Sequence, residues 1–311
     1  NIQNDLLDFS FLPEITKSQQ KDIPKVIQER NDDLNPRGNY LVGFNFQHPI
    51  LQDKEVRLAL YYAINRALFN DTVLQGMREL SNGPFRWNSM RNSQTQPLEF
   101  DLKRAATILT KNGWIMDEAD GIRKKTMNGV PTKLKLVLSY ANRFYEELWK
   151  RYQSDLKSIG VELVLRFYTT PEFFKSMDLG KLDMWAMGWN EDIYEPDLSR
   201  SWHSRVPGKE AFGSHNYGGY SNKMVDRLIE EGMYTSNRKK RNQLLMQAGR
   251  LIADDVPALF LFDEKYYRTA MSPHLTRTSL SQRFGMGIEN LVKLANLPSN
   301  LKSKEAENVA K

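Results

Sequence analysis

The apolar positions of the chain follow two periods, one typical of strands and the other of helices. Short apolar or alternating runs predict strands at 39–46, 161–167, 182–189, 258–262 and 266–270. Apolar residues that recur every three or four positions predict helices at 54–75, 102–111, 144–159, 171–177, 221–233 and 236–255. Because strands and helices alternate along the chain, we expect a mixed α/β fold.

Residue types at the ends of these elements sharpen the prediction. Asp53 stands where an N-cap side chain would accept a hydrogen bond from the first turn of a helix. Asn128 and Gly129 together tolerate the positive φ angles of a type I′ turn. We therefore expect a hairpin between strands at 122–127 and 132–139.

The stretch 182–196 changes character halfway along. Its first half is an apolar strand that ends at Gly188-Trp189, and its second half is acidic and aromatic. Ligands of α/β proteins bind at strand ends, so a Trp and carboxylates in this position indicate one wall of a binding cleft. The candidate ligand-binding residues in this stretch are Trp185, Trp189, Asn190, Glu191, Asp192 and Tyr194. A core strand followed by a solvated acidic turn is the alternative interpretation.

Aromatic residues are concentrated around the same stretch. Between residues 185 and 220 they are interleaved with glycines, and they comprise Trp185, Trp189, Tyr194, Trp202, Phe212, Tyr217 and Tyr220. Loops rich in Trp, Tyr and Gly are typical of recognition surfaces. Packing in the core explains part of such a cluster equally well, so both interpretations stay open.

Composition excludes some kinds of site. Cysteine is absent from the 311 residues, which excludes disulfides, thiolate metal sites and cysteine nucleophiles. No apolar run approaches the roughly 18 residues of a membrane-spanning helix. The net charge is +6, but the one dense basic run, 238–241, begins an amphipathic helix. A solvated helix face explains that run better than a nucleic-acid site, so we expect no nucleic-acid partner.

Motifs of common catalytic and cofactor sites are missing. The chain has neither a phosphate-binding loop nor a nucleophile elbow, and its four histidines lack the spacing of a zinc site. We therefore expect no metal, no cofactor and no enzymatic activity. A carboxylate-dependent hydrolase is the alternative from another class, in which the acids from Glu191 to Asp197 would supply the general acid and base.

A series of short motifs occurs in one order over residues 5–275. The motifs are Phe44-Asn45 with Pro49, Leu51 and Asp53; Val56-Arg57-Leu58-Ala59-Leu60; Ala63-Ile64-Asn65-Arg66; Ala105 through Gly113-Trp114; Gly121-Ile122; Leu156-Lys157-Ser158-Ile159-Gly160-Val161; Leu182-Asp183-Met184 with Gly188-Trp189; Asn216, Gly219-Tyr220, Asn222 and Asp226; and Arg241 and Pro257. In this order they resemble the bacterial extracellular solute-binding proteins of family 5, which are the oligopeptide-, dipeptide- and nickel-binding receptors of ABC importers.

The resemblance implies a periplasmic-binding-protein-like α/β fold of type II, cluster C, whose two lobes close on the ligand. It assigns 1–38 to a lobe 1 fragment and the hinge, and 39–268 to lobe 2. It assigns 269–300 to a return to lobe 1 and 301–311 to a disordered tail. With lobe 1 incomplete, we expect a C-terminal portion of a longer protein, whose leader is not in this sequence. We also expect the isolated chain to bind ligand negligibly.

The resemblance also implies a role and a location. The chain would belong to the substrate-binding component of an ABC importer, which binds peptides and delivers them to the permease subunits. Such a component would be a monomer in the periplasm or at the outer face of the cell membrane. A nickel complex, a sugar or a peptide-like antibiotic is the alternative ligand.

Residue roles follow from matching the family pattern to this sequence. Asp192, a few positions after the Gly-Trp pair, would bind the α-ammonium group of a peptide. Trp189 falls on an aromatic residue of the ligand wall, and Phe144 on a contact to a ligand side chain. Ala186 stands where some oligopeptide receptors carry an arginine, which leaves recognition of the ligand carboxylate unassigned. Arg57 receives a structural role.

Overall fold

The structure is a computed structural model. It describes residues 9–11, 26–30, 39–76, 78–85, 98–189, 197–205, 213–264, 266–271, 275–277 and 291–293, with side chains only between residues 39 and 263, and not for Trp189. The chain divides into two compact units, one formed by residues 1–36 and 264–311 and the other by residues 37–263. Each unit has its own sheets.

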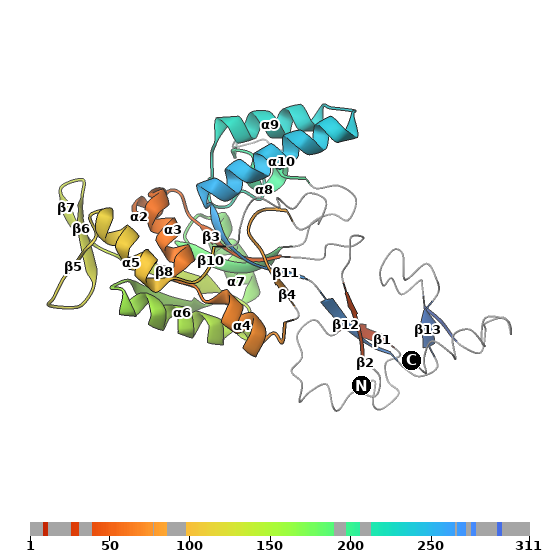
Figure 1. Cartoon of the computed structure of the whole chain (residues 1–311), viewed down its shortest axis with the longest axis horizontal. Coiled ribbons are helices and arrows are strands. Elements are labelled where there is room, and N and C mark those ends of the chain that lie inside the picture. The colour runs from red at the N-terminus through yellow and green to blue at the C-terminus, as the bar shows by residue number, and fades with distance from the viewer. Residues whose placement is uncertain are drawn as a thin grey trace. The chain divides into compact units, whose positions relative to one another are not determined.

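The larger unit is built on a six-stranded mixed sheet, which can be followed in Figure 1. The strand order is β4-β11-β3-β10-β8-β9. These strands are β3 (Asn39–Phe44), β4 (Arg78–Leu80), β8 (Lys135–Tyr140), β9 (Glu162–Phe167), β10 (Met184–Trp189) and β11 (Ala258–Glu264). β3 pairs antiparallel with β10 and β11, whereas β8 runs parallel to β10 and β9. All six residues of β3 are buried, as its apolar run predicts for a central strand.

Helices pack against this sheet and complete one large core. They are α2 (Pro49–Gln52), α3 (Lys54–Tyr62), α4 (Arg66–Thr72), α5 (Leu102–Lys111), η2 (Arg143–Tyr145), α6 (Glu146–Ser158), α7 (Thr170–Asp178), α8 (Ser199–Trp202), α9 (Lys223–Met233) and α10 (Arg238–Asp255). Leu60 of α3 and Trp149 of α6 are buried in the same core as Val42 of β3. α9 and α10 pack together as a helical hairpin (Figure 1). None of the helices that the structure describes is long and apolar enough to cross a membrane.

One helix predicted from the apolar stripe is two helices in the structure. Asp53 caps the first helix as expected, since its side chain accepts a hydrogen bond from Glu55 N at 3.0 Å. That helix ends at Tyr62, and a second begins after Asn65, whose side chain accepts from Leu68 N at 3.1 Å. A side-chain acceptor inside an apolar stripe starts a new helix without disturbing the period, so the prediction of one helix was wrong.

The predicted hairpin is shorter than expected. Asn128 and Gly129 have φ angles of 49° and 80°, which confirms the turn. After the turn the second strand ends early, because the chain leaves this sheet at the fully buried Leu134 and continues as β8 in the central sheet. The small antiparallel sheet consists of β5 (Ile115–Met116), β6 (Arg123–Met127) and β7 (Val130–Lys133).

The smaller unit contains segments from both ends of the chain. Its described strands are β1 (Phe9–Phe11), β2 (Val26–Arg30), β12 (Tyr266–Met271), β13 (Leu275–Arg277) and β14 (Leu291–Lys293). β12 lies between β1 and β2 and pairs antiparallel with both, and β13 pairs antiparallel with β14. The assignment of the chain to two receptor lobes, with boundaries at 38 and 268, stays a prediction. The predicted tail, 301–311, lies outside the described residues.

Arg57 is buried, and its guanidinium bonds to the backbone. Nη1 donates to Leu51 O and Gln52 O at 2.8 and 2.9 Å, Nε to Val256 O at 2.9 Å, and Nη2 to Asp255 O at 2.7 Å. These carbonyl groups lie at the C-terminal ends of α2 and α10, where a helix leaves its acceptors without partners. The structural role expected for Arg57 is confirmed by these contacts.

The contact with α10 matters because the chain changes direction there. Val256 has φ 50°, a left-handed conformation that is strained for a β-branched residue, and β11 begins two residues later. Phe46 packs over the guanidinium of Arg57 at 4.5 Å from its ring centroid. Burial lowers the pKa of Arg57, and the charges of Asp255 and Asp53 oppose that shift. Arg57 therefore stays charged and binds these carbonyl groups through charge-assisted hydrogen bonds.

Replacing Arg57 with Leu should lower the free energy of unfolding of the larger unit by about 3–5 kcal/mol, since hydrogen bonds to charged groups are worth roughly 1.5–3 kcal/mol each and several are lost together. Arg151→Ala is the matched control, because Arg151 pairs with Glu147 on an exposed face of α6. The control should cost about 0.5 kcal/mol or less. Urea unfolding measures both values, and equal losses would contradict the role of Arg57.

Candidate ligand-binding site

β8 and β10 end side by side. The strands are parallel, with Ala186 opposite Tyr140, so their carboxyl ends lie at the same edge of the sheet. Trp189 is the last residue of β10 and pairs with Asn39 at the start of β3. Phe144 follows the end of β8 in η2. The fold therefore brings the chain positions of Trp189 and Phe144 to the edge at which α/β proteins bind ligands.

The predicted ligand-binding residues are only partly described. Trp185 is buried, with 6% of its surface exposed, and packs in a second core cluster. Phe144 is half-buried and meets Tyr145 edge to face, with the ring centroids 5.2 Å apart. Only the backbone of Trp189 is described. The other predicted residues lie outside the described residues, and their roles stay predictions: Asn190, Glu191, Asp192 and Tyr194.

Asp197 is the described member of the acidic group that a hydrolase would use. Its Oδ1 accepts a hydrogen bond from Ser199 N at 2.7 Å, which forms an Asx turn leading into α8. This carboxylate therefore has a structural partner at the start of a helix. Over the described ranges, no group of three or more His, Cys, Asp or Glu side chains is arranged to hold a metal ion.

Two glycines make room for the indole of Trp185. Gly43 pairs with Trp185 across β3 and β10, and a Cβ added to Gly43 would lie 2.6 Å from Cζ2 of the indole. A Cβ added to Gly218 would collide with the carbonyl oxygen of Phe44 and lie 3.3 Å from Cη2 of the indole. Only glycine permits so close an approach of the two backbone segments to the ring. Trp185 thus has a packing role that its place in the sequence does not reveal.

A pocket of about 550 Å³, part of it open to solvent, lies beside Trp185. It is bounded by β3, β10, α8 and the 215–220 loop, and its walls include Asn39, Leu41, Trp185, Met187, Trp202 and Tyr217. Ligand pockets are lined mainly by apolar side chains. The described residues that line this pocket include no Asp, Glu, Lys or Arg. The chemistry of this lining therefore suits an uncharged, apolar group.

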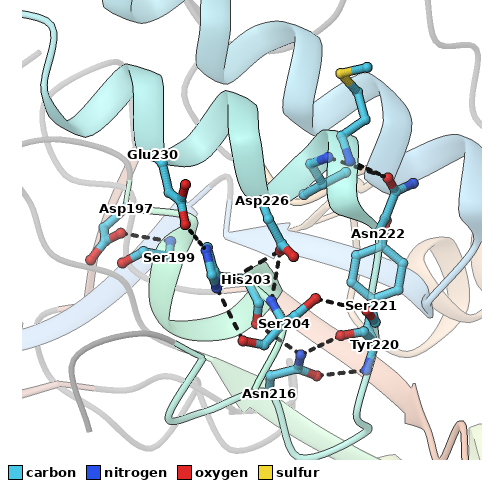
Figure 2. A network of polar contacts seen from close by, with 12 residues as sticks. Asp197, Ser199, His203, Ser204, Asn216, Tyr220, Ser221, Asn222, Asp226 and Glu230 are labelled. Atoms are coloured by element: carbon cyan, nitrogen blue, oxygen red, sulfur yellow. Dashed lines mark hydrogen bonds and ion pairs between the residues drawn. The ribbon is translucent and has the colours of Figure 1, made fainter. Parts of the chain in front are cut away.

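The loop that forms one wall of the pocket is held by polar contacts (Figure 2). Asn216 Nδ2 donates to the carbonyl oxygens of His203 and Tyr220 at 3.0 and 2.7 Å, and its Oδ1 accepts from Tyr220 N at 2.9 Å. The hydroxyl of Tyr220 donates to Asp255 Oδ2 at 2.7 Å, which ties the loop to the end of α10. Asn216 is buried, so water does not compete for these bonds.

His203 connects the same loop to α9. In Figure 2 its ring lies between Glu230 and Ser204, with Nε2 3.0 Å from Glu230 Oε1 and Nδ1 3.1 Å from Ser204 O. Ser204 N donates to Asp226 Oδ1 at 2.8 Å. His203 is buried and hydrogen-bonded, a role that no local sequence signal distinguishes from a surface position. Asn216 and Asp226 stand out in the sequence only as members of the motif series.

His215 stacks on Tyr217 within the 215–220 loop, with the ring centroids 6.1 Å apart and the planes at 21°. Burial lowers the pKa of His215 from its ordinary value of 6.5, and the charge of Arg200 lowers it further. Burial also raises the pKa of Tyr217. Near pH 7 both side chains are therefore neutral, and the pocket carries no formal charge on the described residues that line it.

Gly43→Ala should destabilise the larger unit by about 1–3 kcal/mol, because the added methyl group overlaps the indole of Trp185. Gly188→Ala is the matched control, since Gly188 lies in the adjacent strand β10 and its added Cβ would lie 3.7 Å from Tyr40 Cδ2, an ordinary van der Waals contact. A double variant, Gly43→Ala with Trp185→Leu, should lose less than the sum of the two single changes. Chemical denaturation tests this, and strict additivity would contradict the contact.

The stability of the larger unit should decrease as the pH is lowered, because His215 becomes protonated. Its pKa is lower in the folded than in the unfolded chain, so its contribution is fully present above pH 6.5 and is lost as the pH falls through the lowered pKa. His215→Gln removes this proton-binding group. Between pH 7 and pH 5, the thermal unfolding midpoint of the wild type should therefore fall further than that of the variant. Identical pH dependence in the two proteins would show that His215 is not desolvated.

The pocket lies along β3 and β10 of an α/β unit, and its described lining is mainly apolar. The family model described as "Bacterial extracellular solute-binding proteins, family 5 Middle" matches residues 2–209. The chain belongs to this family. The resemblance inferred from the order of the motifs is thereby confirmed.

Curated relatives carry the names of binding proteins. The chain is 28% identical over 226 residues to the oligopeptide-binding protein AppA of Bacillus subtilis (strain 168), covering 71% of this chain and 40% of the relative. It is 26% identical over 192 residues to the nickel-binding periplasmic protein of Escherichia coli (strain K12), covering 61% and 36%. The chain thus spans about 40% of the length of these relatives.

Solved structures share the fold. AppA from Bacillus subtilis in complex with a nonapeptide superposes with a TM-score of 0.77 at 24% identity, covering 94% of this chain and 57% of that chain. NikZ from Campylobacter jejuni in complex with Ni(L-His) gives a TM-score of 0.73 at 20% identity, covering 94% and 58%. At these identities the likeness concerns the fold alone. It confirms the periplasmic-binding-protein-like α/β fold expected from the sequence.

Proposed function

We propose that the chain belongs to the substrate-binding component of an ABC importer, which binds peptides between two lobes and delivers them to permease subunits. The family match over residues 2–209 carries this proposal. Relatives named for binding oligopeptides and dipeptides support a peptide ligand. The role is binding and not catalysis, in keeping with a family of solute-binding proteins.

A nickel complex is the second candidate ligand. Relatives are named for nickel, and a solved structure of the same fold holds Ni(L-His). A peptide is favoured by the uncharged, apolar pocket beside β10, which suits a side chain better than a charged metal complex. The acidic residues that follow Trp189 in the sequence add a second argument, because a carboxylate there would pair with an ammonium group.

The proposed location is the periplasm or the outer face of the cell membrane, and the proposed state is a monomer. The family description contains the word extracellular, and a relative of Escherichia coli is named a periplasmic protein. DppA from Helicobacter pylori, a structural neighbour solved with the peptide STSA, is described as ABC transporter-associated. These names support a permease as the partner that receives the solute.

Asp192 is the proposed anchor for the α-ammonium group of a peptide. It lies three residues after Trp189, the last residue of β10, and so follows a strand end at the ligand-binding edge of the sheet. In a partly dry cleft, a hydrogen bond between a carboxylate and an ammonium group is stronger than one between neutral groups. Trp189 would exclude water from such a pair. Asn190, Glu191, Tyr194 and Phe144 are proposed as further contacts.

Asp192→Asn in the full-length protein should weaken binding of peptides with free amino termini by about 30-fold to several thousand-fold. This range corresponds to the roughly 2–5 kcal/mol lost when one partner of a buried charge pair is truncated. Calorimetric titration measures the loss. N-acetylation of the peptide should weaken binding to the wild type by a similar factor and add little in the variant.

Asp197→Asn is the matched control, because Asp197 belongs to the same group of acids between Glu191 and Asp197. Its carboxylate accepts a hydrogen bond from Ser199 N, and an asparagine oxygen accepts that bond equally well. The control should bind free and acetylated peptides as the wild type does. Equal affinity of the wild type for free and acetylated peptides would rule out the role proposed for Asp192.

A further inference from the structure

Asn39 places an unsatisfied acceptor in the wall of the pocket. Its side-chain Oδ1 is buried and has no hydrogen-bond partner among the described residues, and 6% of the residue surface is exposed. A buried acceptor without a partner costs free energy, and such groups are rare in native proteins. A donor supplied from outside the chain would remove that cost. Asn39 Oδ1 is therefore a candidate acceptor for a donor group of a ligand.

The position of Asn39 connects the pocket with the predicted ligand wall. Asn39 starts β3 and pairs with Trp189 at the end of β10. It also lines the pocket that continues past Leu41 and Met187 to Trp185. A ligand held at the end of β10 would thus meet the Asn39 acceptor first and the apolar interior of the pocket behind it.

The interior of the pocket selects by polarity and by size. Leu41 and Trp185 are buried, Met187 and Trp202 are half-buried, and the described lining residues carry no formal charge near neutral pH. A charged side chain would lose its hydration against this lining, which includes no Asp, Glu, Lys or Arg among the described residues. An aliphatic or aromatic side chain would instead be removed from water against apolar walls. The indole of Trp185, which lines the pocket, packs closely against the backbone at Gly43. This wall of the pocket is therefore rigid.

We propose that this pocket receives one uncharged, apolar side chain of a bound peptide, and that Asn39 Oδ1 accepts a hydrogen bond from a peptide N–H beside that side chain. The proposal rests on the proposed function, since it names the side-chain class that a peptide receptor would select.

The first experiment measures selectivity in the full-length protein. Calorimetric titration uses three tripeptide series, Xaa-Ala-Ala, Ala-Xaa-Ala and Ala-Ala-Xaa, with Leu, Phe, Ser, Asp or Lys as Xaa. In one series, Leu and Phe should bind at least tenfold tighter than Asp and Lys. Binding of all peptides without preference at any position would overturn the pocket inference and leave the proposed function standing. Failure of every peptide to bind would overturn both.

Filling the pocket should abolish this preference. Ser201 of α8 is half-buried and lines the pocket, so Ser201→Leu occupies part of its volume. The variant should lose at least tenfold in affinity for the preferred Leu or Phe peptide, a larger loss than it shows for tri-alanine. Ser176→Leu is the matched control, since Ser176 is a half-buried helical serine of α7 away from the pocket lining. An unchanged preference in Ser201→Leu would place the selected side chain elsewhere.

Replacing Asn39 separates ligand binding from folding. Asn39→Leu has a similar shape but no acceptor, so every bound peptide should lose roughly 3- to 10-fold in affinity, the range expected for one neutral hydrogen bond. The thermal unfolding midpoint of the ligand-free protein should be unchanged or higher, because the unsatisfied acceptor is gone. A lower midpoint with unchanged affinity would show a structural role and overturn the assignment of Asn39 to the ligand.

Discussion

The guanidinium of Arg57 is the contact on which the geometry of the larger unit depends. It binds carbonyl groups at the ends of α2 and α10, which are far apart in the sequence. By holding the end of α10 it fixes the strained turn at Val256, from which β11 enters the sheet beside β3. Pro257 and Ala258 at that entry line the pocket, as does Phe46, which packs on the guanidinium. The buried guanidinium of Arg57 therefore helps to position both β11 in the sheet and the residues that line the pocket beside it.

The pocket is formed by backbone proximity and by neutral side chains. Glycines at 43 and 218 let two segments approach Trp185, and the bonds of Asn216 hold the loop that covers it. The described lining residues include Asn216, whose side chain has hydrogen-bond partners, and Asn39, whose buried Oδ1 has none among the described residues. Such a site orients a ligand by few polar contacts and selects it by shape and by the cost of burying charge. These properties agree with the side-chain pocket that we propose.

Local signals predicted much of the fold. The apolar run of β3, the cap at Asp53 and the turn at Asn128 act over a few residues, so the sequence displays them directly. The order of the motifs identified the family. By contrast, the contact between Gly43 and Trp185 depends on chain pairing over a long sequence separation, and the bonds of Arg57 depend on where α10 ends. The acceptor of Asn39 could not be predicted either, because a missing partner is visible only when the surroundings are known.

The central claim is that this chain forms part of a peptide receptor with an apolar side-chain pocket. Mass spectrometry of the small molecules released on denaturation of the full-length protein, purified without added ligand, tests it most directly. We expect peptides with free amino termini that carry an aliphatic or aromatic residue at a common position. Release of a nickel complex in place of peptides, or of peptides whose residues at every position are mainly charged, would contradict the account.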